Sequence, residues 1–497
     1  MTSRWLFLSF ALCTMFLYGL ASRGRAQNTG SSGAASVEER LAAIEGKLQL
    51  LENRLDQALG NNGQKINGNG NSEDHGLEAP VGERLEYLDQ KLRILERRRE
   101  LELESTAAKL KEAPLVSAGK NGFVIRSADS AFQLKLGGYI QSDSRFFTDR
   151  DQQKVQRPST FVLRRIRPIF QGTVYKYFDF RLMPDFGNGQ TVIQDAYLDL
   201  NYLPGAKVRF GKFKPPVGLE RLQSGSEILF VERGFPTDLV PNRDVGFQIF
   251  GENLGSVFNY AVGLFNGVPD GENGDSDTNE TKDFAGRVFV NPFGKTNLEP
   301  LKGLGVGLGS SVGSQQGLLP VLRSEGQAII FNYTAGTLAA GTRRRLSPQA
   351  YYYWNNIGLL GEYVQSLQDV RKGTSFGEMN NRSWQVAGSY VLTGEKASYR
   401  GVTPARLFDP RTGQFGALEL AARYSQLSID NDAFILNFAD PKNSISKAST
   451  WTVGLNWYFS RNLKFVVNYE QSHFRGGGTT GDRATEKVLL SRFQVAF

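Results

Sequence analysis

The sequence of 497 residues predicts an all-β protein, a 16-stranded antiparallel transmembrane β-barrel preceded by an N-terminal helical coiled-coil segment. Two observations predict the barrel. Apolar and polar residues alternate at period two from about residue 123 onward, as in Trp451, Val453 and Leu455, over segments long enough to cross a bilayer. Glycine (55) and aromatic residues (11%) are also abundant, while mean hydropathy is only −0.34, as is typical of a turn-rich, many-stranded chain.

Residues 1–26 have the pattern of a secretory signal peptide. Arg4 supplies a basic start, the apolar stretch Trp5–Leu20 follows, and small residues such as Gly24 and Ala26 offer cleavage positions. The apolar stretch is shorter than the roughly 20 residues that a membrane-spanning helix needs. We therefore expect export, and removal of the chain's single cysteine, Cys13, with the signal.

Residues 36–59 and 81–104 are expected to form a coiled-coil stalk with a flexible linker at 60–80. Apolar residues recur at spacings of three and four, which is the seam of a heptad repeat. They are Val37, Leu41, Ile44, Leu48, Leu51 and Leu55, then Val81, Leu85, Leu88, Leu92 and Leu95. A helix packed on its own domain and a partly disordered arm are the alternatives, and the pattern does not choose between dimer and trimer.

The barrel is expected over residues 122–497, and 326–335 is assigned to a loop. A soluble sandwich or propeller is the alternative, but long strands and a final strand that ends in Phe497 favour the membrane barrel. An even strand number returns both ends of the barrel to the periplasm. The expected strands are 132–147, 160–174, 177–186, 191–202, 206–213, 244–250, 256–266, 283–290, 303–313, 346–354, 358–367, 381–393, 415–428, 447–459, 462–473 and 486–497.

Composition argues against several classes of function. With one cysteine and two histidines, His75 and His473, the chain has little means to build a thiolate or histidine metal site or a Ser-His hydrolase. The net charge of +8 is mild and dispersed, which argues against a nucleic-acid partner. We expect no enzyme activity, no metal and no cofactor.

Function is expected in the lumen, because charge that faces lipid is costly. Arg165 and Arg167 share the polar face of the second strand, and Arg145 and Arg181 point the same way on the first and third strands. Arg164 falls on the apolar face of a regular strand, so it needs a bulge or a position above the membrane.

The region after the fifth strand adds further basic and hydroxyl groups, and a loop that folds inward there would narrow the pore. Rings of guanidinium groups favour anions, and their fork suits phosphate oxygens. The alternative is that the arginines pair with nearby acids and line a wide, unselective pore. The basic and hydroxyl residues are Lys212, Lys214, Arg221, Ser224, Ser226, Arg233 and Arg243, and the acids are Asp179, Asp185, Asp195, Asp199, Glu220, Glu227 and Glu232.

Several motifs resemble the phosphate-selective porin O and P family, in order over about residues 122–497. They are Ile193–Leu198, Phe210–Glu220, Phe284–Val288, Leu346–Gln349, Gly358–Tyr363 and Gly416–Tyr424. The resemblance implies a trimer of 16-stranded barrels in an outer membrane that take up phosphate or polyphosphate through a basic pathway.

The resemblance also implies roles for particular residues. The family's paired arginines match Arg164 and Arg165, and its fourth-strand aspartate matches Asp195. Its constriction-loop residues match Lys212, Lys214, Ser224 and Ser226 loosely. The best-known members have a lysine-rich mouth, whereas the corresponding loop here, about 314–345, carries Arg323, Arg343, Arg344 and Arg345 but no lysine.

The sequence therefore predicts an outer-membrane porin with a water-filled, anion-preferring channel for phosphate or other small anions. We expect a homotrimer in contact with outer-membrane lipid, with its stalk in the periplasm and a potential contact to the cell wall. The alternatives are a general diffusion porin and a structural envelope tether whose coiled coil contacts the cell wall.

Overall fold

The computed structural model describes residues 46, 49–50, 81–119, 122–148, 159–203, 205–253, 255, 257–277 and 279–497. The chain forms two compact units, Met1–Ala108 and Lys109–Phe497. The expected signal peptide, nearly all of the first heptad block and the linker 60–80 lie outside the described residues. The second heptad block falls within the 32-residue helix α2 (Val81–Glu112).

The described side chains of α2 are mostly exposed. Leu92 is 47% exposed and Ile94 59%, and charged pairs such as Arg93–Asp89 (2.9 Å) occupy the surface between them. No helix in the described part of the chain is long and apolar enough to cross a membrane. The helix is present where the heptads predicted it, and its pairing into a coiled coil stays a prediction.

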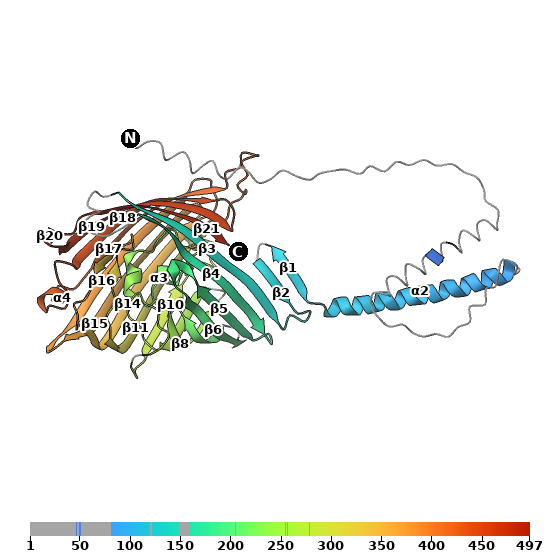
Figure 1. Ribbon diagram of the computed structural model, residues 1–497, viewed down its shortest axis with the longest axis horizontal. Coiled ribbons are helices and arrows are strands. Elements are labelled where there is room, and N and C mark those ends of the chain that lie inside the picture. The colour runs from blue at the N-terminus through green and yellow to red at the C-terminus, as the bar shows by residue number, and fades with distance from the viewer. Residues whose placement is uncertain are drawn as a thin grey trace. The chain divides into compact units, whose positions relative to one another are not determined.

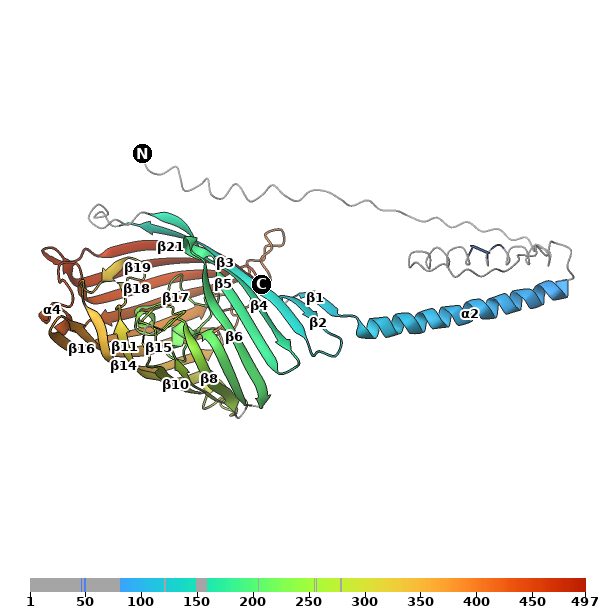
Figure 2. The same ribbon diagram turned by 60° about the horizontal axis from the view of Figure 1, so that its bottom comes forward.

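Sixteen antiparallel strands close into a barrel, in which each strand pairs with the next and the last, β21, pairs with the first, β3 (Figures 1 and 2). They are the sixteen that the alternation predicts. The strands are β3 (Gln133–Phe147), β4 (Thr160–Val174), β5 (Phe178–Asp185), β6 (Val192–Leu203), β7 (Ala206–Phe213), β8 (Asp244–Asn253), β9 (Phe258–Phe265), β10 (Asp283–Val290), β11 (Leu304–Gly317), β14 (Leu338–Trp354), β15 (Ile357–Lys372), β16 (Ser375–Val391), β17 (Ala417–Ser428), β18 (Ile445–Tyr458), β19 (Leu463–Gly478) and β21 (Glu486–Ala496). We call the end where β3 begins the proximal end and the other the distal end.

The wall of the barrel is polar inside and apolar outside. On β4, Phe161 (76% exposed) and Leu163 (53%) face outward, whereas Arg165 (3%) and Arg167 (7%) are buried in the lumen. A water-soluble protein shows the opposite arrangement. Exposed apolar side chains on the outer surface suit contact with lipid. Closure of the barrel leaves no unpaired strand edge, as a membrane-spanning sheet requires.

A hairpin of β1 (Leu115–Gly119) and β2 (Gly122–Arg126) precedes the barrel. Strand β2 pairs with the first residues of β3, from Gln133 to Leu136. The last strand pairs with β3 only from Tyr139 onward, and Phe497 exchanges two backbone hydrogen bonds of 2.9 Å with Gly138. The ring of Phe497 also contacts Phe123 of β2 edge to face, at 6.3 Å between centroids.

Segments between strands fill the distal half of the lumen. The loop 214–243 between β7 and β8 carries α3 (Leu219–Leu222) and η3 (Phe235–Leu239), and α3 lies inside the barrel in Figure 1. The loop 318–337 carries a two-stranded sheet of β12 (Leu322–Arg323) and β13 (Ile329–Phe331). Apolar residues of both loops share one buried cluster, including Phe235, Leu239, Leu322 and Phe331. The remaining elements are η2 (Gly187–Gly189), η4 (Glu299–Leu301), α4 (Asp432–Ile435) and β20 (Gly481–Asp482).

Several strands extend beyond their expected bounds at the distal end, β14 the most. Strand β15 ends at Lys372 rather than 367, β16 begins at Ser375 rather than 381, and β19 ends at Gly478 rather than 473. Residues Arg343, Arg344 and Arg345, expected in the loop 314–345, lie on β14, which begins at Leu338 rather than 346. Near its distal end the strand has polar residues on both faces, because the outward-facing Arg344 pairs with Glu378 of β16. Alternation is therefore lost there although the backbone ladder continues.

Candidate functional site: a lumen narrowed by a basic loop

The loop 214–243, here called the constriction loop, is held across the lumen by side chains of the barrel wall. The carboxylate of Glu362 on β15 accepts hydrogen bonds from the backbone N–H groups of Leu219 (2.6 Å) and Glu220 (3.2 Å). On the other side of the barrel, Gln494 of β21 donates to the carbonyl of Ser226 at 3.0 Å. Further wall residues that bond the loop's backbone are Gln141, Arg423, Asn456, Lys464 and Asn468. Buried backbone groups of the loop are thereby satisfied without water.

Glu232 of the constriction loop is a shared counter-ion for the arginines on the wall. Its carboxylate lies 2.5 Å from Arg164 Nε, 3.2 Å from Arg145 and 3.6 Å from Arg165. Burial acts to raise the pKa of Glu232, but the guanidinium groups of Arg164, Arg165 and Arg145 outweigh it and hold the pKa well below its usual range. One carboxylate against three guanidinium groups leaves a positive excess.

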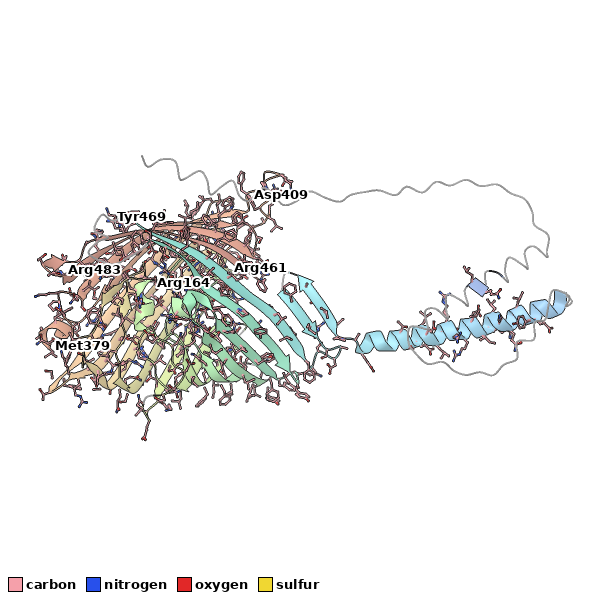
Figure 3. The ribbon with its side chains drawn as sticks, viewed as in Figure 1. Arg164, Met379, Asp409, Arg461, Tyr469 and Arg483 are labelled. Carbon is pink, nitrogen blue, oxygen red and sulfur yellow. The ribbon has the colours of Figure 1, made fainter. Side chains whose placement is uncertain are left out.

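Arg164 reaches this cluster through a bulge in β4. The register with β3 runs from Gln141 opposite Arg165 to Ser142 opposite Leu163, so Arg164 is the extra residue. An arginine facing lipid at the midplane would cost about 2–4 kcal/mol, and the bulge turns this side chain inward instead. The structure thus selects the bulge from the two alternatives that the alternation left open. Figure 3 labels Arg164 on the barrel.

A second group of charges lies beside Asp195 and Asp185. Asp195 of β6 accepts from Arg181 and from Arg243, both at 3.2 Å. Asp185 accepts from Arg167 Nε at 2.7 Å, and Arg167 also donates to the hydroxyl of Tyr139 at 2.7 Å. Part of the arginine set is therefore neutralised by ion pairing, as the unselective alternative foresaw.

Three cations of the constriction loop bond only backbone carbonyls within the described residues. Lys214 donates to the carbonyl of Gln223 at 2.8 Å. Arg233 donates to the carbonyls of Glu220 (3.1 Å) and Gln223 (2.8 Å), and Arg221 to that of Thr237. A carbonyl fixes such a group without cancelling its charge. Burial, and secondly the guanidinium groups of Arg243 and Arg233, hold the pKa of Lys214 well below its usual value.

Two cavities flank the narrowing. The distal cavity, of about 300 Å³, is lined among others by Arg164, Arg165, Arg167, Arg221, Arg233, Arg243 and Arg323, together with Asp185, Glu232, Asp238, Asp270, Glu272 and Glu325. The proximal cavity, of about 440 Å³, is lined by Arg181, Arg243, Lys214 and Ser224, and includes Asp195 and Glu227. Within the described residues, Arg243 alone borders both cavities. Arg243 therefore lies at the division of the pathway.

The pKa values of two acids in the distal cavity bear on its charge. Burial raises the pKa of Asp238 to about 7, although Arg221 acts in the opposite direction. Burial also raises the pKa of Glu325, against the effect of Arg423. Asp238 therefore carries less than a full negative charge near neutral pH, and Glu325 is paired with Arg423, so the arginines dominate the cavity.

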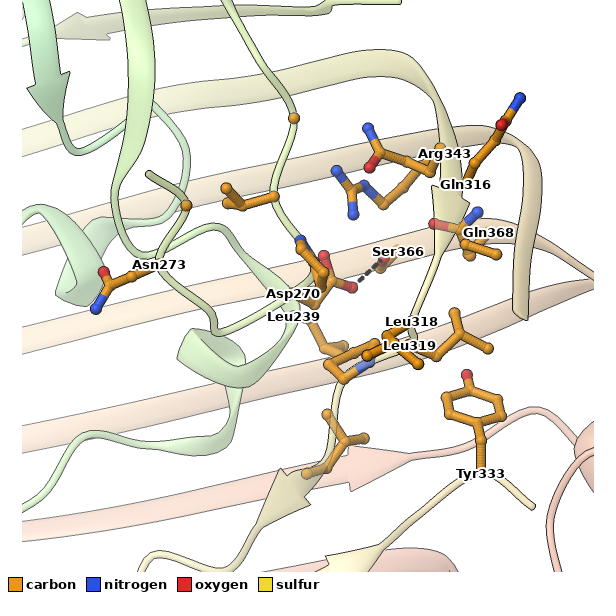
Figure 4. Close-up of a pocket in the computed structure, with 18 of the residues that line it drawn as sticks. Leu239, Asp270, Asn273, Gln316, Leu318, Leu319, Tyr333, Arg343, Ser366 and Gln368 are labelled. Atoms are coloured by element: carbon orange, nitrogen blue, oxygen red, sulfur yellow. Dashed lines mark hydrogen bonds between the residues drawn. The ribbon is translucent and has the colours of Figure 1, made fainter. Parts of the chain in front are cut away.

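A third cavity, of about 270 Å³, opens beside the distal one, with which it shares Asp270 and Asn273 (Figure 4). Leu239, Leu318, Leu319 and Tyr333 line it together with Arg343. Asp270 accepts a hydrogen bond of 2.6 Å from Ser366 there. Its lining is more apolar than that of the distal cavity.

Not every predicted residue borders the pathway. Lys212 is 4% exposed and pairs with Asp275, away from both the distal and the proximal cavity. Arg145 lies behind the cavity wall, on Glu232. Ser224 and Ser226 bond each other at 2.9 Å, and only Ser224 borders the proximal cavity. Within the described residues, no cluster of His, Cys, Asp and Glu is suited to hold a metal ion.

Sequence reasoning missed several residues of the site. Arg492 of β21 is fully buried and forms two 2.7 Å bonds to Asp143 of β3, and Arg287 of β10 borders the proximal cavity. Both lie on the polar face of an expected strand, which was the available signal. Glu232 was foreseen as a partner for arginines, but sharing among three of them depends on the fold of the loop.

A closed 16-strand barrel with an apolar outer wall and a lumen narrowed by a basic loop defines an outer-membrane porin, a protein that forms a channel. The chain belongs to the phosphate-selective porin O and P family, whose model matches residues 134–497.

The individual proteins to which this chain is similar share little sequence identity with it. Porin O of Pseudomonas aeruginosa is 22% identical over 385 residues, which cover 72% of this chain and 86% of that protein. Among solved structures, the outer-membrane channel DcaP of Acinetobacter baumannii has a TM-score of 0.49 at 11% identity and covers 75% of this chain and 99% of its own. The anion-selective porin from Comamonas acidovorans has a TM-score of 0.46 at 15% identity, with coverage of 74% and 100%.

Proposed function

We propose that this porin forms a water-filled, anion-preferring channel for the passive uptake of phosphate or polyphosphate. The proximal end of the barrel faces the periplasm, and anions pass from the distal cavity past Arg243 into the proximal cavity. In this proposal Arg164, Arg165, Arg167 and Arg181 attract the anion from the wall, and Asp195 positions Arg243.

One observation carries the proposal: Lys214, Arg221 and Arg233 are fixed in the constriction by backbone carbonyls rather than by carboxylates. The charges of Arg221 and Arg233 therefore remain available to a passing anion, and Lys214 adds hydrogen-bond donors beside them. Arginine groups held at fixed positions also bind phosphate oxygens through paired N–H donors. Fixed positive charges in a constriction repel permeating cations. An unselective pore has no need of such charges.

The test is the reversal potential of the purified protein in a planar bilayer under a KCl gradient, followed by phosphate titration. We expect strong anion selectivity and a chloride current that is blocked by phosphate at low concentration. Arg233→Gln should weaken both. Arg411→Gln removes the same charge from the exposed tip of the turn 392–416, where Arg411 is 87% exposed beside Asp409, and should leave both unchanged. Weak selectivity without a phosphate block would leave a general diffusion porin.

We further propose that the chain is a homotrimer whose residues 36–59 and 81–104 form a periplasmic stalk that contacts the cell wall. Support comes from Leu92 of the heptad seam, which is 47% exposed on α2 at a position that a partner helix would cover. Cross-linking of the purified protein, run on a denaturing gel, should give a band of three chains. Cross-linked bands of one chain only would contradict the trimer.

A further inference from the structure

Arg287 differs from the other arginines around the proximal cavity in how it is paired. Arg209 forms two bonds to Asp199, at 2.6 and 2.7 Å, and Arg181 and Arg243 both contact Asp195. Arg287 donates from Nε (3.0 Å) and Nη2 (2.9 Å) to a single neutral oxygen, Oε1 of Gln349. Among the described residues, no carboxylate lies within ion-pairing distance of Arg287, so its charge is not cancelled.

The guanidinium group of Arg287 is nevertheless held in one orientation. Gln349 fixes its Nε–Nη2 edge, and the group lies over the ring of Phe289 at 4.5 Å from the centroid. Its Nη1 makes no hydrogen bond within the described residues. The Nη1–Nη2 edge is therefore free, and two parallel N–H donors on one edge match two oxygens of a phosphate, sulfate or carboxylate.

The position of Arg287 suits an anion that has passed the constriction. It lies on β10 and borders the proximal cavity, whose volume of about 440 Å³ exceeds what a single phosphate fills. Lys214 and Arg243 border this cavity as well. An oxyanion that leaves them meets an uncompensated, preoriented guanidinium next on the wall.

We propose that Arg287 forms a second oxyanion site, on the proximal side of the constriction, which holds phosphate before it leaves the channel. The inference rests on the proposed anion channel and adds a separate site to it. A channel that transports a bound ion needs sites that are weak and multiple enough to release it. With one bonding edge available and acids such as Asp195 and Glu227 bordering the same cavity, Arg287 fits the weaker, exit-side role.

The experiment measures block of chloride current by phosphate added separately to each side of bilayers in which all channels share one orientation. Arg287→Gln should weaken block from the proximal side about tenfold, the effect of one lost charge-assisted contact, and change block from the distal side little. Arg287→Lys keeps the charge, and its block from the proximal side should be intermediate between that of the unaltered protein and that of Arg287→Gln. Arg209→Gln removes an arginine that Asp199 already neutralises and should behave as the unaltered protein.

The possible results separate the exit site at Arg287 from the anion channel itself. Equal weakening from both sides, or none from the proximal side, would overturn the exit site while distal-side block still supports the channel. Absence of block from either side in the unaltered protein would overturn the proposed function itself. Heat-modifiable gel mobility and an open-channel current show that each variant has folded, and equal loss in Arg287→Lys and Arg287→Gln would show that charge is not the cause.

Discussion

At the scale of single residues, Glu232 explains why three wall arginines coexist within a few ångströms. Without a carboxylate between them, Arg145, Arg164 and Arg165 would repel one another in a region shielded from water. With one carboxylate, the cluster is held in place but remains positive. Breaking a buried ion pair by removing one partner typically costs about 3–5 kcal/mol, so the cluster also stabilises the position of the constriction loop.

Replacing Arg165 by alanine should reduce anion selectivity, and we expect a phosphate block about tenfold or more weaker, in line with loss of one charge-assisted hydrogen bond. Arg165 borders the distal cavity and donates to Gln141 at 2.7 Å. Arg145→Ala is the matched control, because Arg145 contacts Glu232 without bordering that cavity. Equal selectivity in the two variants would remove Arg165 from the pathway.

Asp238 should make chloride selectivity depend on pH. Below its pKa of about 7 the carboxyl group is neutral and the charge of Arg221 is uncompensated, whereas above it the carboxylate offsets that charge. Anion selectivity should therefore fall as pH rises from about 6 to 8. Arg221 and Arg323 oppose the raised pKa and Glu325 adds to it.

Reversal potentials in KCl measure this without the titration of phosphate itself. Asp238→Asn should remove the change across pH 7, and an unaltered pH profile in that variant would assign the titration to another group.

At the scale of elements, the constriction loop is held from the proximal side as well as from the wall. The turn 392–416 between β16 and β17 places Tyr399 beneath α3, where its hydroxyl donates to the carbonyl of Leu219 at 2.6 Å. Its ring stacks on Tyr351 at 5.5 Å. The tip of the same turn, at Asp409, extends away from the strands (Figure 3). The turn thus joins the proximal end of the barrel to the constriction loop.

Tyr399→Phe should loosen the constriction loop. Loss of one hydrogen bond costs roughly 0.5–1.5 kcal/mol, enough to populate alternative loop positions, so we expect a noisier open-channel current with a nearly unchanged mean. Tyr352→Phe is the control: its hydroxyl bonds the carbonyl of Pro300 at 2.7 Å, at a different turn. Equal noise in both variants would argue that Tyr399 does not position the loop.

Strands whose side chains alternate between lipid and the lumen were predictable from the sequence. The contacts that side chains make inside the lumen were not. All sixteen barrel strands follow from period-two patterns such as that of Trp451 to Leu455, because each outward residue meets lipid. The start of β14 was missed because Arg344 and Glu378 extend beyond the apolar wall. The cluster around Glu232 joins loop and wall residues 68 and 87 positions apart, and no local pattern encodes such contacts.

At the scale of the whole molecule, the residues of the lumen and the proposed stalk residues 36–59 and 81–104 belong to separate units. The barrel unit, Lys109–Phe497, contains every residue of the site. A chain in which residues 27–104 are deleted should therefore keep the reversal potential and the phosphate block of the full protein. The same deletion should reduce co-sedimentation with isolated cell-wall sacculi. Loss of selectivity on deletion would show that the stalk contributes to the pore.

The hairpin of β1 and β2 has a consequence for assembly. Because β2 occupies the β3 backbone up to Leu136, the final strand cannot slide past Gly138 toward the proximal end when the cylinder shuts. The offset at the seam, which determines the tilt of all strands and hence the bore, is thereby set by a segment outside the cylinder. Deleting residues 115–126 should yield slowly maturing or misaligned cylinders, visible as a smaller heat-modifiable fraction and a spread of single-channel conductances.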